Sequence, residues 1–335
     1  MNKPFLLRPS AKDYLWGGSR LNDDFAKEIE VSPLAETWEC STHPEGPSFV
    51  ASGEFQGMSL KDVLRLHPDF IGAHPTASYE LCKNGELPIL IKFIDAKKNL
   101  SVQVHPTDDY ARVNEKGQLG KTEMWYVLDA GKEAELIYGL RHATEKEVIK
   151  KAIEKGTVEK LLQKVKIKKD DLFFIEAGTI HAIGAGALIA EIQENSNLTY
   201  RMYDYDRLDK NGEKRELHIA KALDVANLCS APEPRQPLRI LKYKQGVASE
   251  LLCRCKYFEV YRMLVNTERR QVVEYRADEM SFRVLLCVNG CGTISFAGGN
   301  GREHINVYKG DCIFVPADSV TLLLHGQLQF LDVRS

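Results

Sequence analysis

Short β-prone segments fill most of this sequence, and they limit the folds that the chain can adopt. Each segment is rich in β-branched and aromatic residues and is bounded by glycine, asparagine or aspartate, a pattern typical of strands. The expected strands of the first two thirds of the chain are 87–94, 100–104, 124–128, 134–138, 171–175, 188–192 and 198–203. Because helical segments do not alternate with them, a doubly wound parallel sheet is disfavoured. We therefore predict a mainly β protein, a sandwich or barrel with a few helices.

Helical periodicity is confined to four places. Residues 59–66 are typical of a short capped helix, and the T-x-x-E pattern of 144–147 is a capping box before an apolar-periodic segment. Gly156 ends that helix, and 158–165 resumes the helical pattern. A last helical region covers 217–228. We expect these helices to be insertions around the strands.

A proline-rich stretch divides the chain. The segment CSAPEPRQP, residues 229–237, has three prolines in nine residues and is typical of a linker. An almost pure strand pattern follows it, at 258–265, 282–288, 292–296, 311–315 and 321–324. We predict two domains, 1–230 and 238–335, of which the second is a smaller β-domain.

Charge and cysteine usage narrow the class of protein. A net charge of −2 argues against a general nucleic-acid binder, and no apolar run approaches the ~20 residues of a membrane span. The eight cysteines are scattered without a CxxC pair, and the first residues lack an apolar stretch of signal length. These features predict reduced thiols in a cytoplasmic protein. We expect a small-molecule partner, no nucleic acid and no membrane, and a monomer or weak homo-oligomer.

Three stretches contain side chains suited to chemistry. In SVQVHP, the two-residue spacing places Gln103 and His105 on the same face of a strand. KTEMWYV has Glu123 at the start of a strand with Lys121 two residues before it, and AGTIHAI has His181 after an Ala-Gly turn. Two imidazoles, a carboxylate and a candidate amide form a mixed N/O set suited to a divalent ion such as Zn²⁺, with room for substrate. The other seven histidines lack such a set, and we interpret them as structural.

Together these stretches resemble the type I mannose-6-phosphate isomerases, a zinc-dependent branch of the cupin superfamily. Matching motifs occur in the same order at 4–18, 35–39, 87–95, 101–106, 121–127, 177–183, 191–201 and 203–207. The compact length and the YDYDR ending of the last motif are similar to the short bacterial form.

The resemblance implies a particular architecture, the cupin-type antiparallel jelly roll. In the smaller domain, GDCIFVPA at 310–317 is similar to a second cupin motif, but no histidine follows where a ligand would be expected. We interpret this domain as a degenerate cupin that packs against the first and binds no metal.

The resemblance also implies a site and an activity. His105, Glu123 and His181 would bind one Zn²⁺ per chain, with Gln103 as a candidate fourth ligand. Arg201 would be the catalytic arginine. The same pocket would be lined by the substrate-binding residues Lys92 and Ser101 and by Lys121 and Glu191. The implied reaction is the reversible interconversion of mannose 6-phosphate and fructose 6-phosphate.

That reaction gives the polar residues definite tasks. Aldose–ketose isomerisation moves a proton between C1 and C2 through an enediol-like intermediate, so it needs a group that titrates near neutrality. The field of the cation could lower the pKa of Lys121, burial could raise that of Glu191, and a metal-bound water is a third candidate. The rigid guanidinium of Arg201 could hold the phosphate or a developing oxyanion.

Structural alternatives accompany these assignments. Lys92 could be an edge-strand lysine, Glu191 a paired structural carboxylate, and Arg201 the partner of Asp204 or Asp206. The functional alternatives are a non-catalytic sugar-phosphate sensor and a cupin metalloenzyme of other chemistry.

Two positions depart from the family pattern. Glu176 stands where cupins usually have proline before Ala-Gly, and Asn197 stands four residues before Arg201 where relatives often have aspartate. If that aspartate orients the arginine, asparagine can accept a hydrogen bond but supplies no charge. We therefore expect Asn197 to bear on the rate of turnover more than on the family resemblance.

Overall fold

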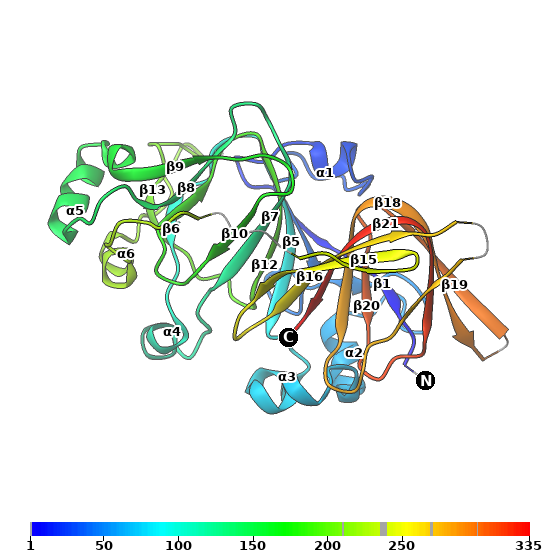
Figure 1. The fold of residues 1–335 in the computed structure, drawn as a ribbon. Helices are drawn as coiled ribbons and strands as arrows, with labels where there is room; N and C mark the ends of the chain where they lie inside the picture. The colour runs from blue at the N-terminus through cyan, green and yellow to red at the C-terminus, as the bar shows by residue number, and fades with distance from the viewer. Residues whose placement is uncertain (1, 210, 235–239, 269–270, 300) are drawn as a thin grey trace.

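The computed structural model describes residues 2–209, 211–234, 240–268, 271–299 and 301–335. The last part of the predicted linker, 235–237, lies outside these residues. Within them three sheets dominate, and their strand pairs are antiparallel. This confirms the predicted mainly β, antiparallel class. Figure 1 shows the sheets side by side, with the helices at the periphery.

Two of the sheets face each other as a β-sandwich. The six-stranded sheet has the order β10 (Leu172–Ile175), β7 (Glu123–Ala130), β12 (Ala187–Glu194), β5 (Ile89–Ala96), β3 (Glu36–Cys40) and β2 (Ser10–Lys12). The five-stranded sheet has the order β13 (Tyr200–Tyr203), β6 (Val102–Val104), β11 (His181–Ile183), β8 (Glu135–Leu140) and β9 (Leu162–Lys166). One apolar core joins Val127 and Ile189 of the first sheet to Leu136 and Ile183 of the second.

The six-stranded sheet is covered on both faces. A second core joins its Ile91, Phe93 and Ile192 to Val284 and Leu331 of the third sheet. Strands β5 and β12 are therefore buried along their whole length. This double cover explains why their sequences are near-continuous apolar runs instead of alternating ones, and why a charge within them needs a partner.

The third sheet has ten strands and lies on the right of Figure 1. Its main path is β14 (Lys242–Lys244), β15 (Val247–Arg254), β16 (Glu259–Asn266), β21 (Leu322–Arg334), β18 (Arg283–Gly298), β20 (Cys312–Val315), β1 (Phe5–Arg8) and β4 (Phe49–Val50). Strand β17 (Val273–Tyr275) pairs with β21, and β19 (Gly301–Tyr308) pairs with β18. Two N-terminal strands thus complete a sheet of C-terminal strands. The division into 1–230 and 238–335 stays a prediction.

Two predictions about secondary structure were wrong, one in the number of strands and one in the kind of element. The separate strands expected at 282–288 and 292–296 form the single strand β18, which bulges between Cys287 and Asn289. The helix expected at 158–165 is a 3₁₀ turn, η3 (Val158–Leu161), followed by β9. Strand β9 pairs with β8 at the edge of the sheet, so tertiary pairing outweighs the local helical period.

The helices lie in the connections between strands. They are α1 (Arg20–Asp23), α2 (Leu60–Leu66), α3 (Ala73–Ser78), α4 (Asp108–Asn114), α5 (Lys146–Glu154) and α6 (Ile219–Val225), with 3₁₀ turns η1 (Pro68–Phe70) and η2 (Glu80–Asn84). Helix α2 has the predicted cap, since Ser59 Oγ accepts a hydrogen bond from Asp62 N. Helix α5 also forms, but its capping box does not, because Glu145 is the N-cap and Thr144 Oγ1 donates to His142 O.

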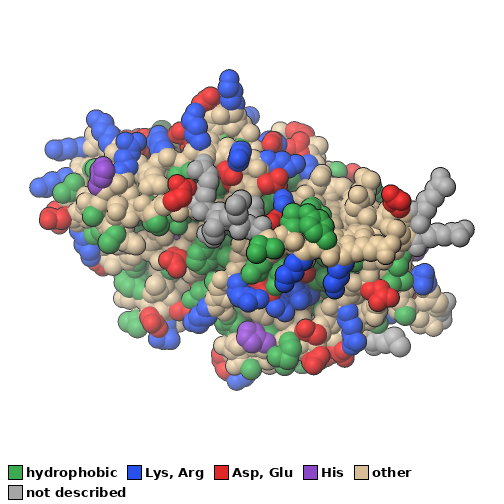
Figure 2. All heavy atoms as spheres, viewed as in Figure 1, with side chains coloured by type: hydrophobic (Ala, Val, Ile, Leu, Met, Phe, Trp, Pro, Cys, Tyr) green, Lys and Arg blue, Asp and Glu red, His purple; other side chains and the backbone are tan. Residues whose placement is uncertain are grey.

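The outer surface carries charges of both signs. Basic and acidic side chains are interspersed over the face shown in Figure 2, in keeping with the near-zero net charge. Across the described ranges, every helix is too short or too polar to span a bilayer.

Candidate metal centre and active site

Three buried side chains meet inside the β-sandwich. His105 follows β6, Glu123 begins β7 and His181 begins β11, and each is at most 1% exposed. The Nε2 atoms of both histidines lie 3.2 Å from Glu123 Oε1. Their ligand atoms all lie within 4.8 Å of one another, so the group can hold a metal ion.

The strand register brings these residues together from distant parts of the chain. His181 of β11 lies opposite Gln103 of β6 in the five-stranded sheet. Glu123 reaches them from β7 in the facing sheet. The ligand set therefore bridges the two layers of the sandwich, and it depends on correct packing of both.

The hydrogen-bonding pattern of His181 and Glu123 leaves their ligand atoms available to a cation. His181 Nδ1 lies 2.8 Å from Thr179 O, which assigns the ring proton to Nδ1 and leaves the Nε2 lone pair facing Glu123. Among the described residues, neither carboxylate oxygen of Glu123 has a hydrogen-bond donor in good geometry. Buried acceptors are rarely left unpaired, so these residues fit a bound cation.

Electrostatics favour the ligand forms of these groups. Burial, followed by the charge of Lys121, lowers the pKa of His105 to about 3, which keeps the ring neutral. Burial opposes ionisation of Glu123, but Lys121 and His105 outweigh it and hold the carboxyl pKa well below its usual range. Neutral imidazole and ionised carboxylate are the forms that bind metals.

Gln103 lies at the edge of this group. Its Nε2 atom is 3.4 Å from His181 Nε2, and amide O and N positions are assigned from such contacts instead of being observed. The amide is thus within reach of the ligand set, and it also faces the cavity described next.

A cavity of about 260 Å³ adjoins the three-residue group. It is lined by all the residues expected to act on substrate, namely Lys92, Ser101, Lys121, Glu191 and Arg201. Lys121 connects the two features, because its Nζ lies 3.2 Å from His105 Nε2 and 3.6 Å from Glu123 Oε2.

Glu191 and Lys92 form a buried ion pair on this wall. Glu191 Oε1 lies 3.0 Å from Lys92 Nζ, and Glu191 Oε2 accepts a hydrogen bond from Trp125 Nε1 at 3.0 Å. Burial, followed by the charge of Glu123, raises the pKa of Glu191, the direction expected for a carboxyl in an apolar strand. The edge-strand alternative for Lys92 is wrong, because β5 is a central strand.

Arg201 is not paired with either neighbouring aspartate. Asp204 binds Arg207 and Arg215, and Asp206 binds Lys214. Instead, Arg201 Nη1 donates to Glu216 O at 2.8 Å. Its Nε is buried without a partner among the described residues, which leaves the guanidinium available to the cavity.

The lining residues missed in the sequence include Tyr14, Trp16, Glu36 and Arg215. The first three lie within or beside the matched N-terminal motifs, so the motifs could have indicated them. Arg215 lies in a charged loop and gave no signal. Asp204 holds it in place through two hydrogen bonds, of 2.8 Å and 2.6 Å.

The family departure at Asn197 has a visible consequence. Asn197 lines the cavity, but its Nδ2 donates to Glu45 Oε2 at 2.6 Å. The asparagine therefore contacts an acidic partner that aspartate at this position would repel.

Comparison of the fold with a solved structure indicates the class of protein. A crystal structure of the mannose 6-phosphate isomerase from Bacillus subtilis superposes with a TM-score of 0.87, at 35% identity and over 99% of both chains. This likeness confirms the predicted cupin-type β fold.

Sequence comparison then identifies the family. Residues 5–144 match the model of the phosphomannose isomerase type I catalytic domain. The mannose-6-phosphate isomerase of Streptococcus mutans is 34% identical over 100% of this chain and 99% of its own. The Bacillus subtilis mannose-6-phosphate isomerase ManA is 40% identical over 77% of this chain and 78% of its own. The chain belongs to the type I phosphomannose isomerase family.

Proposed function

We propose that this protein interconverts mannose 6-phosphate and fructose 6-phosphate with one bound Zn²⁺ per chain. The observation that carries the proposal is the convergence of a buried metal-binding group and four cationic side chains on one cavity. The cationic residues are Lys92, Lys121, Arg201 and Arg215. Kinship with mannose-6-phosphate isomerases supports the choice of substrate.

His105, Glu123 and His181 would hold the metal, with the Gln103 amide as a fourth ligand. Two imidazole nitrogens and one carboxylate match the ligands of catalytic zinc, which leaves a position open for substrate. When bound, the metal would stabilise negative charge on the two substrate oxygens as a Lewis acid.

The phosphate group would be bound by Arg201 and Arg215. Both guanidinium groups face the cavity. Burial, followed by the charge of Arg215, lowers the pKa of Arg201, so the Arg201 cation is destabilised in this cavity. A phosphate between them would relieve that repulsion and accept charge-assisted hydrogen bonds from both.

Proton transfer between C1 and C2 would be carried by Glu191 or Lys121. Glu191 has the raised pKa that suits a proton carrier, and Lys92 would hold its carboxylate in place. Lys121 lies nearer the proposed metal, through His105. Ser101, which is 4% exposed on the same wall, would donate to a substrate hydroxyl.

A coupled assay with mannose 6-phosphate, run with and without a chelator, tests the proposal directly. We expect turnover that the chelator abolishes and Zn²⁺ restores. Turnover that resists complete metal removal would contradict the metal role. No turnover by fully metal-loaded protein would favour the sugar-phosphate sensor.

We also expect a cytoplasmic location. All eight cysteines are free thiols, and two of them, Cys229 and Cys291, are exposed, as suits a reducing compartment. A monomer or weak homo-oligomer remains our expectation for the assembly.

A further inference from the structure

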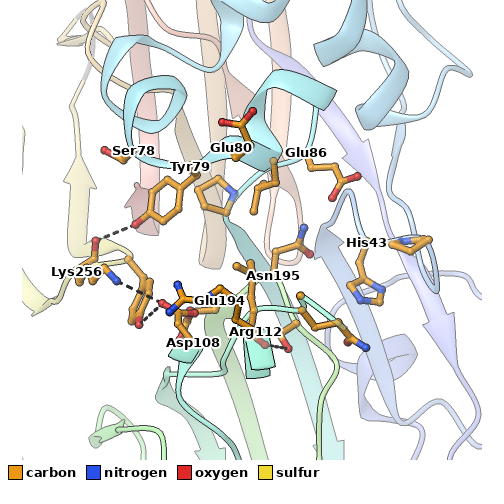
Figure 3. Close-up of a pocket in the computed structure, with 18 of the residues that line it drawn as sticks. His43, Ser78, Tyr79, Glu80, Glu86, Asp108, Arg112, Glu194, Asn195 and Lys256 are labelled. Atoms are coloured by element: carbon orange, nitrogen blue, oxygen red, sulfur yellow. Dashed lines mark hydrogen bonds and ion pairs between the residues drawn. The ribbon is translucent and has the colours of Figure 1, made fainter. Parts of the chain in front are cut away.

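A second cavity, of about 660 Å³, lies where the β-sandwich meets the third sheet. The loop after β3, the α3–η2 segment, helix α4, the end of β12 and the β15–β16 turn all contribute to it (Figure 3). None of its lining residues lines the catalytic cavity. Its volume falls within the range of about 300–1,000 Å³ found for small-molecule sites.

Polar contacts hold the walls of this second cavity in place. Tyr257 Oη donates to Asp108 Oδ2 at 2.8 Å, and Lys256 Nζ lies 3.4 Å from the same oxygen. Tyr79 Oη donates to Lys256 O at 3.0 Å. Figure 3 shows these contacts joining three separate segments around the opening. The cavity is therefore a preformed feature of the junction.

An unpaired amide points into this space. Asn195 is 8% exposed, and its Oδ1 has no hydrogen-bond partner among the described residues. Its Nδ2 makes only a long contact of 3.4 Å with Thr42 Oγ1. Figure 3 shows the amide directed between Tyr79 and His43. Buried polar groups are nearly always paired. A ligand hydroxyl that donates to Asn195 Oδ1 would supply the missing hydrogen bond.

The charges around the cavity are largely compensated within the protein. Burial, followed by the neighbouring Asp108, raises the pKa of Glu194 to about 8, so this carboxyl is mainly protonated at neutral pH. Three of the other carboxylates of the wall have cationic partners, in the pairs Glu80–Lys83 (2.7 Å), Glu86–Lys61 (2.5 Å) and Asp108–Lys256 (3.4 Å). The last one, Glu45, accepts a hydrogen bond from Asn197 Nδ2 at 2.6 Å. A cationic ligand would therefore have to displace an existing partner.

The two cations of the wall are likewise engaged. Arg112 pairs with Asp109 at 2.6 Å, and Lys256 pairs with Asp108. Phosphate would meet acidic groups and no uncommitted cation, in contrast to the catalytic cavity with its four cationic side chains. The charge pattern therefore favours an uncharged ligand rich in hydroxyl groups.

We propose that this cavity binds an uncharged carbohydrate of one or two rings, separately from the catalytic site. The Asn195 amide and the carboxyl groups of Asp108 and Glu194 would bond its hydroxyls. The rings of Tyr79 and Tyr257 would pack against its C–H faces. This inference does not depend on the isomerase activity.

The two cavities share a wall, so an experiment must tell them apart. Asn195 lines the second cavity, whereas Asn197 lines the catalytic one. The test is saturation-transfer NMR on the full-length protein, with methyl α-D-mannopyranoside and maltose as probes. Saturating fructose 6-phosphate is added to occupy the catalytic cavity. We expect saturation transfer to at least one probe, unchanged by fructose 6-phosphate or by inorganic phosphate.

Two variants and a control locate the signal. Ser78 is exposed and lines the second cavity, whereas Ala77, also exposed, does not line it. Ser78→Trp should abolish the transfer by filling the cavity, and Ala77→Trp should preserve it. Asn195→Leu should weaken binding about tenfold, as expected for one lost hydrogen bond.

Four outcomes would overturn the inference. They are no transfer to either probe, loss of transfer with fructose 6-phosphate, competition by inorganic phosphate, and unchanged transfer in Ser78→Trp. Isomerase activity of the same preparations is measured separately, so a failure of the proposed function is distinguishable from a failure of this one.

Discussion

Glu191 lies directly opposite Lys92 across the β12–β5 ladder, and their charged groups approach to 3.0 Å inside the sandwich. Both side chains are at most 5% exposed. A charge pair in a strand covered on both faces has little structural purpose, because well-packed apolar residues there would be as stable or more so. Its position on the wall of the catalytic cavity supplies a functional reason.

The first prediction concerns this pair. Glu191→Gln should lower turnover by about 10²–10⁴-fold, the usual contribution of a general acid or base. It should also destabilise the protein by up to about 3–5 kcal/mol, because the nearest carboxylate left to the buried Lys92 would be that of Glu36, at 3.9 Å. The measurements are kcat at verified metal content and chemical unfolding.

A double variant separates the two effects. Glu191→Gln with Lys92→Met removes both charges, so stability should largely return while turnover stays low. Glu194→Gln, on the same strand but outside the catalytic cavity, is the matched control for turnover. Recovery of turnover in the double variant would make Glu191 a structural residue.

The second prediction concerns metal content. Wild-type protein should contain about one divalent ion per chain by elemental analysis, with zinc the principal metal. His181→Ala should lose it, because a three-residue ligand set cannot spare an imidazole. His142→Ala changes an exposed histidine outside the group and should retain the metal. Equal metal content in both variants would place the ion elsewhere.

The third prediction concerns Arg215. Arg215→Ala should raise the KM for mannose 6-phosphate about tenfold or more, with a smaller change in kcat, since it would lose a charge-assisted hydrogen bond worth about 1.5–3 kcal/mol. Arg207 also binds Asp204 but does not line the cavity, so Arg207→Ala is the control. If both variants raise KM equally, Arg215 acts only through Asp204.

The fourth prediction concerns pH and Glu194. Its folded pKa is about 8, raised by burial and then by Asp108 from the ordinary value of 4.5. Between these values the folded state binds a proton that the unfolded state releases, so stability should fall as pH rises from about 4.5 through 8. The expected contribution over this range is on the order of a few kcal/mol.

Thermal unfolding from pH 5 to 9 tests this contribution. Glu194→Gln keeps a neutral donor beside Asp108, so its stability should depend less steeply on pH and should exceed that of the wild type near pH 9. An unchanged slope in the variant would show that another group carries the pH dependence.

Most strands were predictable because their sequences are locally consistent. Six of the eight residues at 89–96 are apolar, so strand β5 is evident from composition alone. The segment 158–165 was predicted as a helix because its apolar spacing fits one. Its second half forms a strand instead, because it pairs with β8. Helix α4 was missed because its seven residues bury only Ala111, which leaves no apolar period to detect.

The candidate site was predictable in part for a different reason. His105, Glu123 and His181 each lie in a short motif, so separate stretches indicated one metal-binding group. Arg215 has no motif, and it reaches the cavity only because the loop after β13 folds back onto Asp204. Contacts of that kind depend on the tertiary path of a loop, which local sequence does not encode.

Strand β1 joins the first residues of the chain to the last sheet. Phe5 pairs with Phe314 and Leu7 with Cys312, so this ladder closes only after nearly the whole chain has been made. Such distant pairing forms slowly, because a long loop must close before the contact is gained. Cutting the chain at the proline-rich stretch would leave the edge of β20 without its partner, and exposed strand edges promote aggregation. We therefore expect the C-terminal β-sheet, expressed alone, to aggregate unless residues 5–8 are supplied.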